Sequence, residues 1–211
     1  SRRACEFLGV PYEKQRIITC HIGNGGSITA VKDGISVDTS MGLTPTEGLV
    51  MGTRVGDVDP GALTYLMKCE GLDADGLTNV INKKSGVLGI SGISSDMRDI
   101  EDAIAAGNER AKLAMDMYEY RILKYIGAYT AVLGGVDVIA FTAGVGENSP
   151  ELREAICEKL AYMGITLDKE ANRSRGKEVE ISGKDSKVKV VVIPTDEELV
   201  IAQDTAMIVG K

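Results

Sequence analysis

Several residue types and signals are scarce or missing in this sequence of 211 residues, and each absence removes a class of protein. There is no tryptophan and only one histidine, and the four cysteines, Cys5, Cys20, Cys69 and Cys157, form no C-x-x-C pair. Neither a zinc site nor a disulfide framework is therefore predicted. We interpret the cysteines as reduced thiols that are mostly buried.

An excess of positive charge is also missing, since 24 Lys and Arg residues face 31 Asp and Glu residues. No nucleic-acid partner is expected, because no basic excess is available to meet phosphate backbones. No apolar run reaches the roughly 20 residues of a membrane-spanning helix, and we recognise no secretory leader. We expect a cytoplasmic protein without a membrane partner, and a small anionic ligand remains compatible with the net charge of −7.

The chain begins with "SRRACEFLGVPYEKQRI", which has no initiator Met and already shows helix-like periodicity. We expect from this that an N-terminal portion of a longer protein is missing.

Three runs of β-prone residues follow, at 16–22, 27–31 and 35–39, joined by tight glycine turns. They predict a β-meander. The next segment, "MGLTPTEGLVMGTRVGDVDPG", has little periodicity and is predicted to be a long ordered loop. Loops of this length in compact domains are usually functional.

The remaining chain alternates helical patterns with two apolar strands. Helices are predicted from Pro60 to about Lys68, near 73–82, and over 96–133 with a break at Gly107. The last of these carries a stripe that we interpret as core: Ala114, Met117, Tyr118, Ile122, Tyr125, Ile126 and Tyr129.

A buried strand is predicted at 136–141, a turn at 144–148, and a helix from Ser149 and Pro150 to about Met163. A charged hairpin region at 169–187 leads to a strand at 188–193 and to a last helix capped by Thr195. The whole order predicts one α/β domain with inserted helices.

Two glycine segments are candidates for anion binding. In "ITCHIGNGGSITAVKDG" the turn at Asn24 fits a simple hairpin as well as a phosphate cradle, and His21 beside it fits an ordinary loop histidine as well as a functional one. In "FTAGVGEN" a buried strand enters Gly144 just before a helix, which suits an anion. The spacing matches neither dinucleotide-binding nor P-loop templates, and such a turn can need glycine for backbone reasons alone.

Charged residues in glycine-rich loops are the other candidates. Arg54 can either pair with Asp57 or clamp a phosphoryl group, and Asp59 can simply cap the helix that Pro60 opens. Near the last strand, Thr195 and Glu198 have capping-box spacing, which leaves Glu197 as the free acidic group.

Five motifs, in this order, resemble the acetate kinase family over essentially all 211 residues: "CHIGNGGS", "GLTPTEGLVMGTRVGDVDPG", "GISGISSDMRDI", "FTAGVGENSPELRE" and "IPTDEELVIA". The resemblance implies an α/β, ribonuclease-H-like, actin-like ATPase fold of βββαβαβα type with inserted helices. It also implies that residues 1–211 form the C-terminal nucleotide-binding domain of such a kinase, without the N-terminal domain.

The resemblance assigns roles residue by residue. Arg54 would stabilise the transition state, and Glu197 would bind Mg²⁺ or Mn²⁺. Three segments would contact the nucleotide. The phosphate-side segment is His21, Ile22, Gly23, Asn24 and Gly25, and the adenosine-side segment is Asp96, Met97 and Arg98. The second glycine segment is Gly144, Val145, Gly146, Glu147 and Asn148. Asp196 departs from the family, in which asparagine is common there.

Members of this family transfer a phosphoryl group reversibly between ATP and acetate, giving acetyl phosphate and ADP, and associate as homodimers. The family's second acetate-contacting arginine, catalytic aspartate, stabilising histidine and metal-side asparagine are expected in the absent N-terminal half. This chain alone is therefore expected to be inactive. Propionate or butyrate kinase activity and a non-catalytic nucleotide-binding or dimerisation module are the alternatives.

Overall fold

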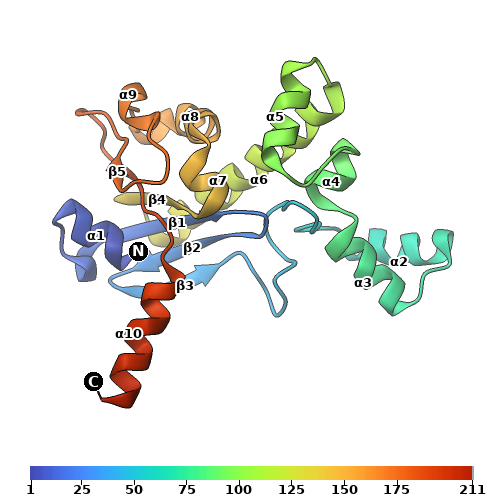
Figure 1. Ribbon diagram of the computed structural model, residues 1–211, viewed down its shortest axis with the longest axis horizontal. Helices are drawn as coiled ribbons and strands as arrows, with labels where there is room; N and C mark the ends of the chain where they lie inside the picture. Colours follow the sequence, from blue (N-terminus) through green and yellow to red (C-terminus); the bar gives the residue numbers. More distant parts are fainter. Residues whose placement is uncertain (211) are drawn as a thin grey trace.

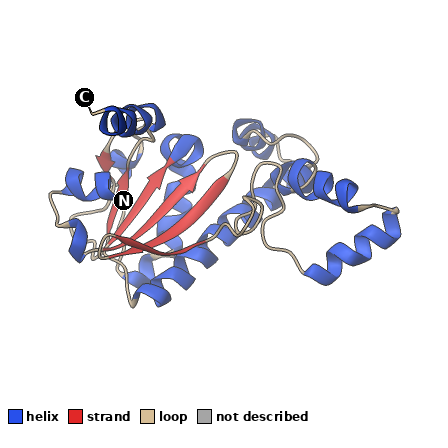
Figure 2. Ribbon diagram, turned by 90° about the horizontal axis from the view of Figure 1, so that it is seen from below, coloured by secondary structure: helices blue, strands red, loops and turns tan. Residues whose placement is uncertain are grey.

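A mixed six-stranded sheet forms the centre of the computed structural model, which describes residues 1–210 apart from the side chain of Glu197 (Figures 1 and 2). The strand order is β3-β2-β1-β4-β6-β5. The strands are β1 (Arg16–Ile22), β2 (Gly26–Lys32), β3 (Ile35–Thr39), β4 (Val138–Thr142), β5 (Val179–Glu180) and β6 (Lys189–Val192).

The strand directions confirm the predicted fold class. β1, β2 and β3 form an antiparallel meander, and β4 and β6 run parallel to β1. The short β5 is an addition at the edge, where it pairs antiparallel with β6. The α/β fold of βββαβαβα type with inserted helices is therefore present.

The helices also follow the predicted order, with ends shifted by a few residues. They are α1 (Arg2–Leu8), α2 (Pro60–Glu70), α3 (Ala74–Lys83), α4 (Gly86–Ser91), α5 (Met97–Ala105), α6 (Glu109–Leu133), α7 (Ala143–Asn148), α8 (Pro150–Lys159), α9 (Lys169–Asn172) and α10 (Glu197–Val209), with 3₁₀ turns at Tyr12–Lys14 and Ala161–Met163. Two differences matter: α4 lies in a segment with no predicted element, and the turn predicted over 144–148 is a helix instead.

Side chains on the two faces of the sheet form two cores, because successive residues of a strand point to opposite faces. Ile18, Cys20 and Ile22 of β1 pack with α6 on one face, whereas Ile17 packs with α1 on the other. The predicted α6 stripe is buried at Ala114, Tyr118, Ile122, Ile126 and Tyr129, while Met117 is 41% exposed. The interpretation of the stripe as core is thus confirmed, with Met117 as the exception at its margin.

The cysteines behave as predicted from their spacing. Cys5, Cys20 and Cys157 are buried free thiols, and Cys69 is exposed on α2. Burial raises the pKa of the Cys157 thiol to about 12, so this thiol stays protonated at neutral pH.

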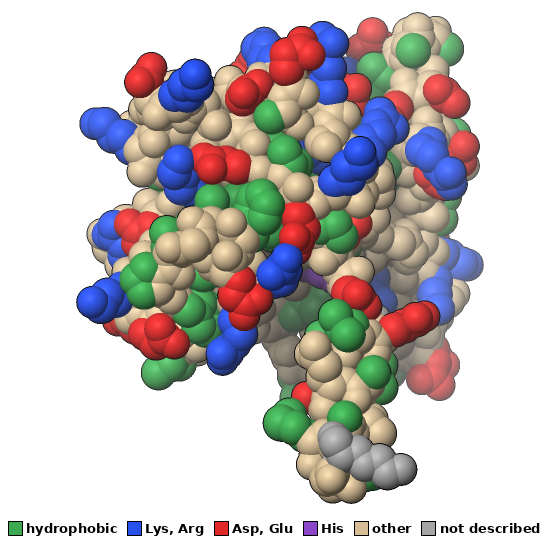
Figure 3. All heavy atoms as spheres, turned by 60° about the vertical axis from the view of Figure 1, so that its left-hand side comes forward, with side chains coloured by type: hydrophobic (Ala, Val, Ile, Leu, Met, Phe, Trp, Pro, Cys, Tyr) green, Lys and Arg blue, Asp and Glu red, His purple; other side chains and the backbone are tan. Residues whose placement is uncertain are grey.

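Two parts of the molecule project from the sheet and its cores. α2 and α3 extend away from the sheet and contain no buried residue (Figures 1 and 2). α10 stands out from the body, and hydrophobic side chains cover much of it (Figure 3). They include Leu199, Val200, Ile201, Met207, Ile208 and Val209. Within residues 1–210, no helix has both the length and the apolar character needed to cross a bilayer.

Candidate functional site

The sheet brings the two glycine segments together. β1 and β4 are parallel neighbours in register from Ile17 with Val138 to His21 with Thr142, so both strands end at the same edge. A Cβ atom built on Gly23 would lie 3.7 Å from Cβ of Ala143. Open α/β sheets bind ligands outside the carboxyl ends of such strands.

The first glycine segment is a tight turn between β1 and β2. The Gly23 N–H donates to the Gly25 carbonyl at 3.1 Å, and the Asn24 carbonyl accepts from the Gly52 N–H at 2.9 Å. The segment is therefore fixed both within itself and to the long loop. Of its predicted neighbours, Ile22 is fully buried in the core, and His21 lies within strand β1.

The second glycine segment is helix α7, which starts directly after β4. The reversal is made by Ala143, whose φ of 65° lies in the left-handed region, and its N–H donates to Oγ1 of Thr195 at 3.2 Å. Gly144 does not have a positive φ, and no atom that the structure describes lies within 4 Å of a Cβ built on it. The interpretation that this segment needs glycine for backbone reasons is therefore wrong for Gly144.

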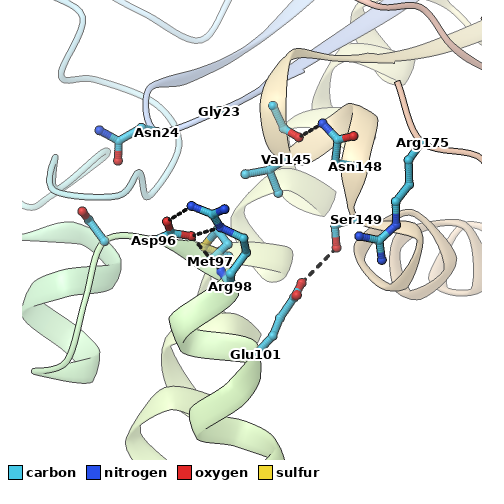
Figure 4. A pocket seen from close by; sticks show the side chains of 12 residues that line it. Gly23, Asn24, Asp96, Met97, Arg98, Glu101, Val145, Asn148, Ser149 and Arg175 are labelled. Carbon is cyan, nitrogen blue, oxygen red and sulfur yellow. Dashed lines mark hydrogen bonds and ion pairs between the residues drawn. The ribbon is translucent and has the colours of Figure 1, made fainter. Parts of the chain in front are cut away.

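A cavity of about 600 Å³ lies between these segments and the start of α5 (Figure 4). We call it the larger cavity. Met97 and Val145 contribute apolar side chains to its lining, and Gly23 and Gly144 contribute backbone. The lining residues are Gly23, Asn24, Ser95, Asp96, Met97, Arg98, Glu101, Gly144, Val145, Asn148, Ser149 and Arg175.

Eight of the thirteen predicted nucleotide-contacting residues are thus brought together in one cavity from three separate parts of the chain. Five lie outside that lining: His21, Ile22, Gly25, Gly146 and Glu147. Four lining residues were missed by the sequence analysis: Ser95, Glu101, Ser149 and Arg175. Ser149 had a signal only as a helix cap, and Arg175 lies in a charged stretch without a motif.

Helix α5 presents an ion pair at the cavity. Asp96 caps the helix by accepting from the Arg98 N–H at 3.0 Å. The Arg98 guanidinium donates to both carboxylate oxygens, at 3.0 and 2.6 Å (Figure 4). These bonds lower the pKa of Asp96 to about 2, so Asp96 is ionised at neutral pH.

A second cavity of about 510 Å³ lies on the other side of Asn24. We call it the arginine cavity. Its lining residues are Asn24, Pro45, Thr53, Arg54, Asp75, Thr78, Asn79, Asn82 and Lys83. Asn24 is therefore shared by both cavities.

Arg54 reaches over the first glycine segment. Its Nη1 lies 2.9 Å from a Cβ built on Gly25 and donates to the Pro45 carbonyl at 3.1 Å. Within the described part of the chain Arg54 forms no ion pair, while Asp57 pairs with Arg121 at 2.7 Å. The structural pairing of Arg54 with Asp57 is thus wrong.

Asp57 has a structural role in the long loop. Its carboxylate accepts from the Gly48 N–H at 2.9 Å and from the Tyr125 hydroxyl at 2.9 and 3.1 Å. The Asp57 N–H in turn donates to the Gly48 carbonyl at 3.1 Å. Asp57 therefore closes the loop that carries Arg54. Asp59 caps α2 as predicted, by accepting from the Gly61 N–H.

The predicted capping box of the last helix is wrong. The cap of α10 is Asp196, whose Oδ1 accepts from the Leu199 N–H at 2.9 Å. The Thr195 N–H, which was assigned to Glu198, donates to Oε1 of Glu147 at 2.8 Å. The reason is that Thr195 turns toward β4, where its Oγ1 lies 2.6 Å from Oγ1 of Thr142.

The predicted metal ligand, Glu197, begins α10, and its side chain lies outside what the structure describes. Among the described residues, no group of three or more His, Cys, Asp and Glu side chains is arranged to hold a metal ion.

Comparison with known proteins places this geometry in a family. A model described as the acetokinase family matches residues 1–203. An acetate kinase of Phocaeicola vulgatus is 64% identical over all 211 residues, which cover 53% of its own length. The chain thus spans about half the length of the curated relatives it matches.

Two solved structures are also similar. The crystal structure of Porphyromonas gingivalis acetate kinase superposes with a TM-score of 0.96 at 62% identity, covering 99% of this chain and 52% of that one. A propionate kinase from Francisella tularensis gives a TM-score of 0.89 at 43% identity, covering 97% of this chain and 52% of that one.

Proposed function

The chain belongs to the acetokinase family, and from this premise we propose that it is the C-terminal, nucleotide-binding half of an ATP:acetate phosphotransferase. In the proposed reaction an acetate oxygen attacks the γ-phosphorus of ATP, the bond to the β-phosphate oxygen breaks, and acetyl phosphate and ADP form. The reverse reaction makes ATP.

One observation carries the proposal: two cavities meet at Asn24, and Arg54 lines the second. In our proposal the nucleotide occupies the larger cavity, with its base between Met97 and Val145 and its phosphates toward Asn24. The γ-phosphate then reaches the arginine cavity. Acetate approaches from that side.

The chemistry suits these residues. The transferring phosphoryl group passes through a loose, metaphosphate-like transition state, so that positioning and positive charge accomplish most of the catalysis. Arg54 has no carboxylate partner among the described residues and is available to the equatorial phosphoryl oxygens. The other cationic and acidic groups around the transferring phosphoryl group would come from the half of the relatives' sequences that this chain does not cover.

Magnesium fits the donor chemistry near the start of α10. Mg²⁺ prefers a few carboxylate oxygens together with substrate phosphates. Glu147 and Asp196 place carboxylates at this end of the sheet, and Glu197 is the next residue after Asp196 in the sequence. We propose that Glu197 holds Mg²⁺. Bound there, Mg²⁺ would neutralise phosphate charge.

Nucleotide binding by the 211-residue chain tests the proposal directly. Titration with ATP, ADP and AMP, with and without Mg²⁺, is expected to give saturable binding that strengthens with the number of phosphates. A hydroxamate assay with ATP, Mg²⁺ and acetate is expected to detect no turnover by this chain. Absence of nucleotide binding would exclude the proposed site, and turnover at a typical kinase rate would contradict the role as one half of an enzyme.

Propionate kinase activity is the second candidate, because a propionate kinase shares this fold at 43% identity. The higher identity to acetate kinases favours acetate. Steady-state rates of the complete enzyme with acetate, propionate and butyrate decide between them. A non-catalytic module is the remaining alternative, and the retained Arg54 and Glu197 argue against it.

We also propose a cytoplasmic homodimer. α6 exposes more hydrophobic side chains than a solvated helix needs, among them Leu113, Met117, Tyr120 and Val132. Light scattering over a range of concentrations tests the oligomeric state. A mass of 22.4 kDa for the chain at every concentration would contradict the dimer.

A further inference from the structure

Arg153 of α8 is a fully buried cation beside the larger cavity. Within the described residues no carboxylate lies within 4 Å of its guanidinium. Burial of an unpaired charge is costly unless hydrogen bonds compensate for the lost water. The function described so far makes no use of this residue.

The guanidinium is compensated by oxygen atoms of two segments. Nη1 donates to the Gly146 carbonyl at 2.8 Å. Nε donates to Oδ1 of Asn172 at 2.9 Å, and Nη2 donates to the carbonyls of Asn172 and Ser174 at 2.6 and 2.9 Å. Asn172 is itself buried and donates from Nδ2 to the Pro150 carbonyl at 2.8 Å.

These two segments form one wall of the larger cavity. Gly146 belongs to α7, which provides Gly144, Val145 and Asn148 to the lining, and Ser174 directly precedes Arg175, which also lines it. Arg175 extends toward Ser149, at the side of the cavity away from Asn24 (Figure 4). One buried side chain therefore joins the helix and the loop that carry this wall.

We propose that Arg153 is a positioning residue that holds Arg175 and α7 in register, and that Arg175 contacts the base or ribose of the nucleotide. The proposal rests on the function proposed above. With the phosphates toward Asn24, the opposite side of the cavity receives the nucleoside. A guanidinium suits that partner, because its planar N–H groups donate hydrogen bonds to the edge of a base or to ribose hydroxyl groups.

The charge of Arg153 persists under physiological conditions, since burial lowers its pKa only to about 10. A lysine there would keep the charge but would lose the planar fork that reaches three carbonyls at once. Arg153→Lys is therefore the informative conservative variant. Arg153→Met removes charge and fork together and is the harsher one.

The test measures ADP and inorganic diphosphate binding to the 211-residue chain and its variants. Arg175→Ala is expected to weaken ADP binding about tenfold, which corresponds to about 1.4 kcal/mol, with diphosphate binding unchanged. Arg153→Lys is expected to weaken ADP binding several-fold in the original chain but not in the Arg175→Ala chain, because coupled residues are not additive. Arg16→Met removes a guanidinium that donates to Asp137 and to the Gly134 carbonyl, away from the cavity. It is expected to lower the melting temperature without changing ADP binding.

Three outcomes would overturn the assignment. The first is unchanged ADP binding by Arg175→Ala. The second is an Arg153→Lys effect that is equally large in the Arg175→Ala chain. The third is an Arg153→Lys variant that loses ADP binding and diphosphate binding equally, which would make Arg153 a general stabiliser of the fold. If the original chain binds diphosphate but no ADP, the proposed nucleotide site fails first, and this assignment fails with it.

Discussion

The two glycine segments follow neighbouring parallel strands, yet they differ in the element that comes next and in what surrounds their glycines. After β1 the chain turns back at once into an antiparallel strand, and Arg54 covers the turn so closely that a Cβ built on Gly25 would lie 2.9 Å from its Nη1. After β4 the chain enters helix α7, and the residue with the left-handed backbone is Ala143, not a glycine. None of Gly23, Gly25 and Gly144 has a positive φ. Gly25 leaves room for the Arg54 side chain, whereas Gly144 leaves open space in the cavity wall.

The difference indicates how the site is divided. The first segment lies between the two cavities and under the proposed catalytic arginine, whereas the second lines only the larger cavity. Changes near the first are expected to affect catalysis most. Changes in the second are expected to affect nucleotide affinity.

The largest expected effect comes from removing Arg54. In the complete enzyme, Arg54→Ala is expected to lower kcat by about a thousandfold or more, as loss of a charge-stabilising donor does in phosphoryl transfer. ADP binding by the 211-residue chain is expected to change little. Steady-state kinetics and ADP titration measure the two effects. An activity loss that follows entirely from weaker ADP binding would contradict the division of the site.

A side chain at Gly144 tests the second segment. Gly144→Leu is expected to weaken ADP binding about tenfold, since the new side chain occupies cavity space, while stability is kept because leucine favours helices more than glycine does. Gly127→Leu in α6 is the matched control, because a Cβ built there also lies more than 4 Å from every described atom outside its own helix backbone and chain neighbours. Equal ADP affinities for the two variants would show that the space at Gly144 is not used.

Two variants at the start of α10 test which residue caps this helix. Asp196→Ala is expected to lower the free energy of unfolding by about 1 kcal/mol, the usual cost of losing an N-cap, because Asp196 accepts from the Leu199 N–H. Glu198→Ala is expected to have little effect on stability. Chemical denaturation of both variants measures this, and the reverse ranking would restore the capping box that the structure replaces.

The smallest effect is expected at the opposite ends of β1 and β4, where Arg16 pairs with Asp137 at 2.6 Å. Hydrogen bonds from Arg16 lower the pKa of Asp137. Its contribution to stability is therefore complete above the usual aspartate pKa and is lost as the pH falls through the lowered one.

Since both side chains are about a third exposed, Asp137→Asn is expected to cost no more than about 1 kcal/mol at neutral pH and to flatten the acid side of the stability profile. Denaturation at several pH values between neutral and acid measures both. ADP binding is expected to stay unchanged. A clear loss of binding would mean that this end of the strands also supports the site.

Local sequence determined the elements of this protein and most of their order. The meander at 16–39, the cap at Asp59 and the break before α6 follow from patterns a few residues long, since turn residues, caps and apolar periodicity act over that range. The five motifs also identified the family without any coordinates. α4 had no such pattern, because its six residues include two glycines.

The partners of individual polar groups were decided only by the tertiary structure. Thr195 had the spacing of a capping box, yet it bonds to Thr142, Ala143 and Glu147, residues about fifty positions away in the chain. Arg175 had no motif, and it reaches the larger cavity because Arg153 binds the loop before it. A hydrogen bond forms with whatever group the folded sheet places within reach, and that proximity is a property of the packed strands rather than of neighbouring residues.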